Sequence, residues 1–284
     1  MVTCGTLYIV ATPIGNRADL SERARQVLAE VDLIAAEDTR HSGQFLAQLG
    51  IKKPLFSLHD HNEADKASVL LEKLQTGLNI ALVSDAGTPL VSDPGYRLVA
   101  AVGEAGLSVV PIPGACAAIA ALSVAGLATD RFVFEGFLPS RSVARRARLD
   151  ALVAETRTLV FYEAPHRIVE CLQEMGAVLG VERRAVLARE LTKLHESIYR
   201  GSLGGLAVQA AADSNMTRGE AVLVVAGAPE APTGAESGNR QVDKLLTTLL
   251  LHVPLSQAVD LTVEISGERR NRVYDRALAL KNAV

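Results

Sequence analysis

The sequence predicts an α/β protein with two α/β domains, the first with a mostly parallel sheet and the second with a mixed sheet, and a small C-terminal helical module. Three observations predict this class. From residue 5 to about residue 126, short β-branched runs alternate with amphipathic helical patterns, which is typical of a parallel sheet with helices on its faces. From residue 132 to about residue 226, strand patterns outnumber helical ones. The segment 228–239 is rich in Pro, Gly, Ala and Ser, which predicts a flexible linker.

The first domain, residues 1–128, is expected to alternate strands and helices. The predicted strands are Leu7–Ala11, Leu33–Ala36, Leu55–Leu58, Ile80–Ser84 and Val109–Ile112. The predicted helices are Ser21–Val31, Gly43–Leu49, Glu63–Gln75 and Tyr96–Glu104. Ser21 is suited to be the N-cap of the first helix. The uncharged stretch 105–129 is broken by Gly and Pro, so it predicts a strand, a turn and a small-residue helix instead of a membrane span.

The second domain is predicted over residues 129–227 and the helical module over residues 240–284. The strand patterns of the second domain are Phe132–Phe137, Thr158–Tyr162, Ala185–Arg189, Ser197–Tyr199 and Ala221–Ala226, with a helix after Pro165. A short turn between residues 184–190 and 195–201 predicts an antiparallel hairpin. The helical patterns of the module are Gln241–His252, Ser256–Ile265 and Arg270–Leu280. The last two resemble a helix-turn-helix unit.

Composition narrows the function classes. The chain has 284 residues, of which 49% are hydrophobic and 21% are charged, and this excludes a chain disordered throughout. A net charge of −3 gives no overall attraction to polyanions, so nucleic acid would have to be met by local patches. The three cysteines are too few and too scattered for a disulfide framework, and the first residues lack a signal-peptide pattern. The cytoplasm is the expected compartment.

The loops after the predicted strands are the first place to look for a ligand site, because parallel sheets bind ligands outside the carboxyl ends of their strands. Two such loops, Asp85–Pro89 and Pro113–Ala117, are rich in small residues, which would let a ligand reach backbone amides while Asp85 supplies an anion. Ordinary Gly-Thr-Pro and Pro-Gly turns are the alternative. Neither G-x-G nor GxxxxGK[ST] occurs, which argues against the common NAD and ATP sites.

Several motifs together carry a family resemblance. They are Val10-Ala-Thr-Pro-Ile-Gly-Asn16, Ala35-Ala-Glu-Asp-Thr-Arg-His41, Leu58-His-Asp-His-Asn-Glu63, Leu82-Val-Ser-Asp-Ala-Gly-Thr-Pro89, Ser92-Asp-Pro-Gly95, Phe161-Tyr-Glu163 and Leu187-Ala-Arg-Glu-Leu-Thr-Lys193. In this order they resemble the ribosomal RNA small subunit methyltransferase I family, part of the tetrapyrrole methylase superfamily. The resemblance implies an S-adenosylmethionine-dependent enzyme that methylates a cytidine ribose 2′-hydroxyl in the decoding region of 16S ribosomal RNA. It also implies a homodimer.

The resemblance further implies a cofactor pocket between the two domains. From the first domain it would take Pro13, Asp85, Ala86, Gly87, Thr88, Cys116 and Ala117. From the second domain it would take Tyr162, Glu163, Glu190, Leu191, Gly219 and Glu220. The chemistry is consistent, because adenine needs an apolar slot, the ribose diol needs an acceptor and the sulfonium tolerates nearby carboxylates.

Methyl transfer to a ribose oxygen is an in-line displacement that depends on positioning and electrostatics. A general base helps, because a 2′-hydroxyl is a poor nucleophile. The candidates are Glu37, Asp38, His59, Asp60, Glu163, His166, Glu190 and Lys193. A lysine desolvated beside the cationic sulfonium could be neutral enough to act as a base. Each candidate could instead be a cap or a loop hydrogen-bonding residue, and the sequence leaves the choice open.

No metal site is expected. His59-Asp-His61 with Glu63 offers ligand atoms but lacks the common zinc spacings, and polar residues are ordinary just before a helix. Cys116 is expected to be a small pocket-lining residue, because no triad-like His and acid follow it in a recognisable order.

RNA contacts are expected from two arginine clusters. The first comprises Arg141, Arg145, Arg146 and Arg148, and the second comprises Arg269, Arg270, Arg272 and Arg276. Each cluster could instead be one solvated helix face. Since the chain has no Trp and only 4% aromatic residues, broad base-stacking platforms are excluded, and binding should rest on phosphate contacts and RNA shape.

Two other functions compete with rRNA methylation. A tetrapyrrole methyltransferase would also use arginines, against the carboxylates of its macrocycle, but a small macrocycle needs no helix-turn-helix module. A non-catalytic RNA-binding or ribosome-assembly protein would keep the fold without binding the cofactor. The methylated nucleotide, the general base and the form of the RNA substrate, bare or within the small ribosomal subunit, are left open by the sequence.

Overall fold

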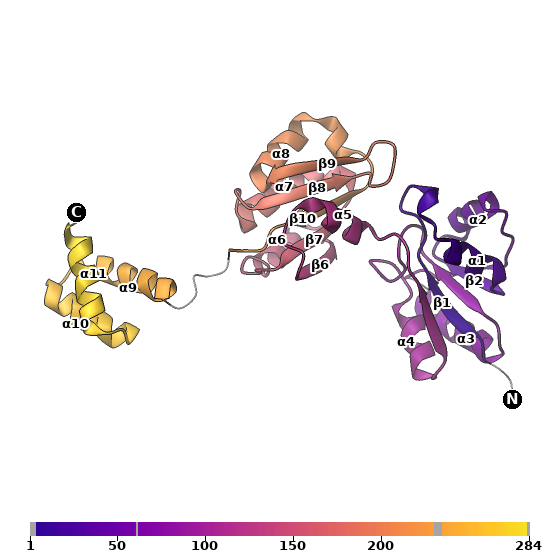
Figure 1. The fold of residues 1–284 in the computed structure, drawn as a ribbon, viewed down its shortest axis with the longest axis horizontal. Coiled ribbons are helices and arrows are strands. Elements are labelled where there is room, and N and C mark those ends of the chain that lie inside the picture. Colours follow the sequence, from indigo (N-terminus) through magenta and orange to yellow (C-terminus); the bar gives the residue numbers. More distant parts are fainter. Residues whose placement is uncertain (1–3, 61, 230–234, 283–284) are drawn as a thin grey trace. The chain divides into compact units, whose positions relative to one another are not determined.

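The computed structural model of the chain describes residues 4–60, 62–229 and 235–282. It divides into two compact units, Met1–Ala228 and Pro229–Val284. The first unit contains two sheets and the second consists of helices (Figure 1). No helix of the described ranges is long and apolar enough to cross a membrane.

The first sheet is wholly parallel. Its strands are β1 (Thr6–Val10), β2 (Leu33–Ala36), β3 (Leu55–Ser57), β4 (Ile80–Val83) and β5 (Ser108–Ile112), in the order β3-β2-β4-β1-β5. The helices between them are α1 (Glu22–Glu30), α2 (Thr39–Gln48), α3 (Glu63–Gln75) and α4 (Tyr96–Glu104), with a 3-10 turn η1 (Arg17–Asp19). Leu70 and Leu98 of α3 and α4 pack on one face, while Leu28 and Leu46 of α1 and α2 pack on the other. The result is a three-layer sandwich that buries both faces (Figure 1).

The second sheet is mixed. Its strands are β6 (Phe132–Phe137), β7 (Thr158–Glu163), β8 (Arg184–Arg189), β9 (Ser197–Ser202) and β10 (Ala221–Val225), in the order β6-β7-β10-β8-β9. Only the β6–β7 pair among these is parallel. The helices are α5 (Ala117–Ala125), α6 (Ser142–Asp150), α7 (Ile168–Leu179) and α8 (Leu203–Ala212), with 3-10 turns η2 (Pro165–Arg167) and η3 (Ser214–Thr217). Helices α6, α7 and α8 cover one face and α5 covers the other.

Alternation along β7 decides which side chains reach which face. Leu159 and Phe161 lie in the core under α6 to α8, whereas Val160 and Tyr162 pack on the α5 side. Since side chains alternate along a strand, Glu163 falls on the same side as Phe161.

The predicted fold class is confirmed, including the mixed second sheet and the hairpin β8–β9. Most predicted boundaries in the first sheet are within one residue, but the start of α2 was wrong, because the helix begins at Thr39 and not at Gly43. The Asp38 carboxylate accepts hydrogen bonds from the backbone N–H groups of Arg40 and His41, and this N-cap starts the helix four residues earlier. Helices α6 and α8 were not among the predicted elements.

The C-terminal unit contains α9 (Ala235–Leu250), α10 (Leu255–Ser266) and α11 (Arg270–Asn282). Its small core joins Val242 and Leu246 of α9 with Val259 of α10 and Val273 and Ala277 of α11. Helix α9 begins at Ala235, inside the range 228–239 predicted as a linker, so the linker was predicted too long. The domain boundary at residues 128 and 129 stays a prediction, because both sheets belong to one compact unit.

Candidate active site

The loops after β1 and β4 are joined directly, because these two strands are neighbours in the parallel sheet. The backbone N–H of Thr12 donates to the carbonyl of Gly87 at 2.8 Å, and the N–H of Gly87 donates back at 3.1 Å. Gly87 has φ +85°, and a Cβ there would lie 3.3 Å from Cγ2 of Ile14. The chain therefore needs Gly at this position both for its backbone conformation and for the close approach of the loops.

A cavity of about 420 Å³, here called the main pocket, opens beside this junction. It is lined by Ile14, Glu37, Asp85, Ala86, Gly87, Thr88, Val91, Ser92, Asp93, Cys116, Ala117, Phe137, Tyr162, Glu163, Ala164, Pro165, Ala188, Leu191, Glu220, Ala221 and Val222. Most residues predicted for the cofactor lie in this wall. Pro13, Glu190 and Gly219 do not line it.

A second cavity of about 330 Å³, here called the side pocket, adjoins the main pocket. It is lined by Thr12, Pro13, Ile14, Gly15, Arg17, His41, Ser42, Gln44, Phe45, Gln48, Ser84, Asp85, Ala86, Lys193 and Glu220. Ile14, Asp85, Ala86 and Glu220 line both cavities. Pro13 thus lies in the side pocket, and its expected contact with a cofactor stays a prediction.

Tyr162 forms an aromatic wall of the main pocket. Its ring packs edge-on against Phe134 at 5.0 Å and Phe137 at 5.6 Å between ring centroids, an arrangement aromatic pairs favour. Its hydroxyl oxygen accepts a hydrogen bond from the backbone N–H of Ala118 at 3.2 Å. Burial raises the pKa of Tyr162, with the Cys116 thiol adding to the shift. The phenol therefore stays neutral and acts as a rigid wall.

Glu37, Asp85 and Asp93 are three of the five acidic residues that line the same pocket. Asp85 is anchored by the backbone N–H of Asp38, which donates to its Oδ1 at 3.1 Å. Burial raises the pKa of Asp93 to about 6; the Ser84 hydroxyl opposes the shift, and the charges of Glu37 and Asp85 add to it. Burial also raises the pKa of Glu37, and the Asp85 charge raises it further.

Asp93 was missed as a candidate from the sequence. Its signal was available in the turn Ser92-Asp-Pro-Gly95, but that segment follows no predicted strand directly. Asp93 reaches the pocket because the chain winds from β4 to α4 through residues 84–95, with Leu90 and Ser92 at positive φ.

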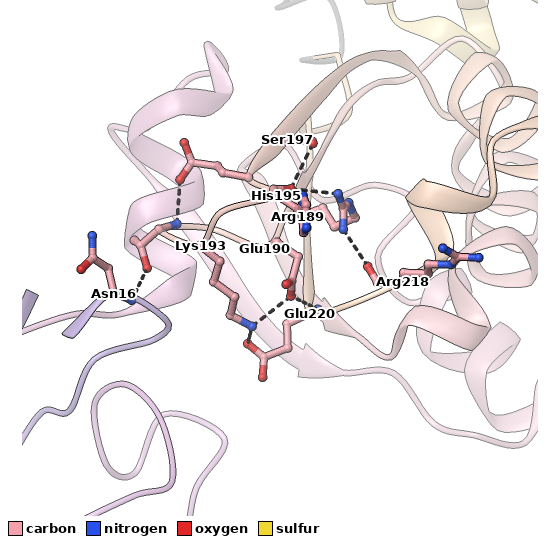
Figure 2. Close-up of polar contacts among 10 residues, drawn as sticks. Asn16, Arg189, Glu190, Lys193, His195, Ser197, Arg218 and Glu220 are labelled. Atoms are coloured by element: carbon pink, nitrogen blue, oxygen red, sulfur yellow. Dashed lines mark hydrogen bonds and ion pairs between the residues drawn. The ribbon is translucent and has the colours of Figure 1, made fainter. Parts of the chain in front are cut away.

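In the turn after β8, the Lys193 ammonium is held between the carboxylates of Glu190 and Glu220, an arrangement here called the clamp (Figure 2). Lys193 Nζ donates to Oε1 of Glu190 and to Oε2 of Glu220, both at 2.9 Å. Oε1 of Glu190 also accepts the backbone N–H of Glu220 at 2.8 Å. The Thr192 hydroxyl accepts the backbone N–H of Asn16 at 3.1 Å, which connects the turn to the loop after β1.

The clamp fixes the charge of Lys193, contrary to the hypothesis of a neutral lysine base. Burial alone would lower the pKa of Lys193, but hydrogen bonds from its ammonium to the two carboxylates outweigh burial and raise it. Burial alone would raise the pKa of Glu190, but the backbone N–H of Glu220 and the Lys193 ammonium lower it. Both groups are charged at neutral pH, so Lys193 is withdrawn as a base.

Glu163 is also withdrawn as a base. Its side chain is fully buried on the α7 side of the sheet, where it pairs with the Arg167 guanidinium at 3.3 Å. Its Oε1 accepts the backbone N–H of Ala164 at 2.8 Å, and the Cys171 thiol lies beside it. Glu163 therefore lines the main pocket without presenting its carboxylate to it.

The other base candidates lie outside both cavities. Asp38 caps α2, and Arg40 and then His41 lower its pKa by hydrogen bonding. His59 contacts the Asn62 side-chain amide at 3.0 Å, and neither His59, Asp60 nor His166 is among the lining residues. With Glu163 set aside, Glu37 is the one base candidate from the sequence that remains among the described residues lining the main pocket.

The residues considered for a metal behave differently. The buried Glu63 carboxylate accepts the backbone N–H groups of Gly95 at 3.1 Å and Arg97 at 2.7 Å, so it caps the start of α4. His61 lies outside the described residues. Within the described ranges, no cluster of three or more His, Cys, Asp or Glu could hold a metal ion.

The first arginine cluster divides into different environments. Arg145 was expected to contact RNA, but its side chain is 1% exposed and pairs with Glu170 and Glu174 of α7. This prediction was wrong, because α6 turns Arg145 toward α7. Arg148 is half-exposed and binds Glu135 with two hydrogen bonds, at 2.7 and 2.8 Å. Arg141 and Arg146 are exposed to solvent.

The second cluster lies on and before α11. Arg276 pairs with Asp243 of α9, so it holds two helices of the C-terminal unit together. Arg270 pairs with Asp260 at 2.8 Å and Arg272 with Glu268 at 3.5 Å, and both side chains are more than half exposed. Arg269 is exposed. Exposed cations of this kind are available to phosphates, whereas Arg276 is partly committed to the fold.

The fold and the paired cavities define a methylase of the tetrapyrrole type. A family model of tetrapyrrole (corrin/porphyrin) methylases matches residues 6–207, and one of the RsmI C-terminal HTH domain matches residues 236–281. Uroporphyrin-III-C-methyltransferase from Thermus thermophilus aligns with a TM-score of 0.56 at 21% identity, covering 78% of this chain and 94% of that chain. The methyltransferase CobJ aligns with a TM-score of 0.59 at 21% identity, covering 81% and 97%.

Curated relatives give the narrower family. Ribosomal RNA small subunit methyltransferase I of Haemophilus influenzae is 53% identical over 275 residues, 97% of each chain. The protein of the same name from Pseudomonas aeruginosa is 52% identical over 277 residues, 98% of each chain. The chain belongs to the ribosomal RNA small subunit methyltransferase I family.

Proposed function

We propose that the protein transfers the methyl group of S-adenosylmethionine to the ribose 2′-hydroxyl of a cytidine in the decoding region of 16S ribosomal RNA. One observation carries this proposal. The chain is 52–53% identical, over nearly its whole length, to two proteins named ribosomal RNA small subunit methyltransferase I. The two cavities that share a wall at Asp85 and Ala86 support it, because a methyl donor and its acceptor must meet.

The main pocket fits S-adenosylmethionine in size and in chemistry. Its 420 Å³ lies within the range of small-molecule sites. Ala117, Leu191 and Val222 supply an apolar wall, and the Gly87 backbone leaves room for close approach. The carboxylates of Asp85 and Asp93 complement the positive charge of a sulfonium. When bound, the cofactor supplies an electrophilic methyl group on a cationic sulfur.

The chain's own residues must handle the proton of the ribose hydroxyl. Glu37 and Asp93 line the main pocket with raised pKa values, and a carboxylate whose pKa approaches the working pH is the more effective base. In this assignment Asp93 or Glu37 accepts the proton. Asp85, which lines both cavities, positions the methyl donor and its acceptor relative to each other.

We infer that the exposed arginines and the C-terminal unit bind the RNA and that this RNA is part of the small ribosomal subunit. The exposed guanidinium groups of Arg141, Arg146, Arg269, Arg270 and Arg272 support phosphate contacts. A cytoplasmic homodimer completes the proposal, and the exposed apolar side chains of Ile119 and Val124 on α5 support a subunit interface.

The decisive experiment uses small ribosomal subunits from a strain that lacks this protein. Purified protein and labelled S-adenosylmethionine should place one 2′-O-methyl group on a cytidine of the 16S rRNA, located by mass mapping. Asp85→Ala should abolish transfer and weaken cofactor binding at least tenfold in calorimetry. Asp85→Asn keeps an oxygen for the Asp38 N–H and should fold like the parent.

Three results would contradict the proposal. Transfer to a carboxylated tetrapyrrole but not to the small subunits would favour the tetrapyrrole alternative. Absence of heat with S-adenosylmethionine would favour the non-catalytic RNA-binding alternative. A methyl group on a base atom would refute the assignment to the ribose oxygen.

A further inference from the structure

The side pocket adjoins the main pocket and has walls that the main pocket does not share. Most of the residues in its wall are polar, and they come from the loop after β1, from α2, from the loop after β4, and from Lys193 and Glu220. Five α2 residues line it, and four of them, His41, Gln44, Phe45 and Gln48, have the spacing i, i+3, i+4 and i+7 that places them on one side of a helix; the fifth is the buried Ser42. Leu46 of the same helix packs in the core, so α2 is fixed while its other face lines the cavity.

The opposite wall is held in place by contacts across the fold. The Thr12 backbone pairs with Gly87, and the Asn16 N–H is bound by the Thr192 hydroxyl (Figure 2). A Cβ on Gly15 would overlap the side chain of Lys193, so the loop runs tightly against the clamp. A wall fixed at both ends is preformed for its ligand, which reduces the entropy lost on binding.

One cation in the wall of the side pocket, Arg17, is not committed to a carboxylate of the described residues. Lys193 is already neutralised by Glu190 and Glu220. Arg17 is exposed and, among the described residues, has no ion-pair partner. His41 is exposed at the first turn of α2. Arg17 and His41 are therefore the groups in this wall that are available to phosphate.

We propose that the side pocket binds the target nucleotide of the RNA, turned out of its helix, with the base against Phe45 and its edge on the side-chain amides of Gln44 and Gln48. The flanking phosphates lie at Arg17 and His41. This inference rests on the proposed function. Amides offer both donors and acceptors to a base edge, and an unstacked base is read by one aromatic contact and edge hydrogen bonds. The ribose then lies at the shared wall of Asp85 and Ala86, next to the main pocket.

The test compares alanine variants on two faces of the protein. Gln44→Ala and Gln48→Ala remove exposed amides from the side pocket, and Gln209→Ala removes an exposed amide from α8 as the matched control. Each side-pocket variant should lose about tenfold in kcat/KM on small ribosomal subunits, the effect of one good hydrogen bond. The dissociation constant for S-adenosylmethionine should stay within twofold of the parent, and Gln209→Ala should match the parent in both measurements.

A second pair separates the phosphate contacts. Arg17→Ala should raise KM for the small subunits and reduce its salt dependence, whereas Arg25→Ala, an exposed arginine on α1, should leave both unchanged. Phe45 is partly buried against the core, so Phe45→Ala would remove packing as well as the aromatic face. Phe45→Leu keeps the packing but loses the aromatic face, and it should lower kcat/KM without changing the melting temperature.

The outcomes distinguish this inference from the proposed function. If the parent protein methylates the small subunits but Gln44→Ala, Gln48→Ala and Arg17→Ala all have its kcat/KM, the nucleotide does not bind in the side pocket. If the three variants lose cofactor binding as well, the side pocket belongs to the cofactor site. If the parent itself transfers no methyl group, the proposed function fails before the inference is reached.

Discussion

The carboxylate of Glu190 occupies the space into which a Cβ on Gly219 would project. Gly219 has φ +73° and Glu190 has φ +52°, so two turns in unusual backbone conformations fit against each other. This fit lets Oε1 of Glu190 accept both the Glu220 N–H and the Lys193 ammonium. The clamp beside the two cavities therefore depends on the absence of a side chain at residue 219.

Gly219→Ala should displace the Glu190 carboxylate and open the Lys193 clamp. Backbone strain costs roughly 1–2 kcal/mol, and the overlap with Glu190 should add roughly 1–3 kcal/mol. Gly106→Ala is the control, because Gly106 has φ +68° with no atom within 4 Å of the added Cβ. Urea unfolding should show the larger loss for Gly219→Ala, together with reduced methyl transfer. If both variants lose the same free energy of unfolding, the Glu190 side chain can move away from the added Cβ without destabilising the fold.

The rate of methyl transfer should rise with pH through about 6. The pKa of Asp93 is about 6, so below that pH its carboxyl group is protonated and cannot accept a proton. We expect kcat/KM for S-adenosylmethionine, which reports groups of the free enzyme, to increase up to tenfold per pH unit below 6 and to level off above 7. If Asp93 is the base, Asp93→Asn should remove this inflection and lower the plateau; an unchanged inflection would assign the proton to Glu37 instead. Glu155→Gln is the control, because the pKa of Glu155 is about 2 and its charge is constant over this range.

The same raised pKa of Asp93 predicts the pH dependence of stability. The folded state holds the Asp93 proton more tightly than the unfolded state, so this contribution to stability is present below pH 3.8 and lost as pH rises through 6. Chemical unfolding at pH 5 and pH 8 should therefore show Asp93→Asn gaining stability relative to the parent at pH 8. If the free energy of unfolding of Asp93→Asn differs from that of the parent by the same amount at pH 5 and pH 8, the pKa of Asp93 is not raised in the folded state.

The sequence predicted the first sheet well because each strand is a short apolar run with helices on both sides. Glu63–Gln75 and Tyr96–Glu104 were predicted to the residue. The prediction failed where long-range contacts decide the outcome. Nothing local indicates that Arg145 faces Glu170 and Glu174 about 25 residues away along the chain, or that Lys193 is held charged by two carboxylates. Side-chain direction along β7 also removed Glu163 from the base candidates.

Arg145→Ala should destabilise the fold and leave RNA binding unchanged. The buried guanidinium pairs with Glu170 and Glu174 and donates to the Ser140 carbonyl at 3.3 Å. Removing it loses packing and leaves these partners unpaired, at a cost of about 2–4 kcal/mol. Arg146→Ala, one residue on and exposed, should change stability by less than about 0.5 kcal/mol. Denaturant unfolding measures the stability of both variants. If the RNA affinity of Arg145→Ala depends less steeply on salt than that of the parent, the Arg145 guanidinium does contact a phosphate.

The arginines of the C-terminal unit should divide into RNA contacts and a structural contact. Arg270 and Arg272 are more than half exposed, so each should contribute about 0.7–0.9 to the slope of log affinity against log salt. Arg276 holds α11 to α9 through Asp243, so Arg276→Ala should speed amide hydrogen exchange in these helices while largely keeping the slope.

The salt series is measured on the full chain with 16S rRNA fragments from the decoding region. Arg270→Ala and Arg272→Ala should each give a shallower slope than the parent, and Arg270→Lys should restore it, because a lysine retains the charge that releases counterions. Hydrogen exchange in the described helices should be unchanged in Arg270→Ala, since its pair with Asp260 is exposed and exposed pairs add little stability. Parent-like slopes in both alanine variants, with faster exchange, would make the cluster a brace for the three helices instead of an RNA surface.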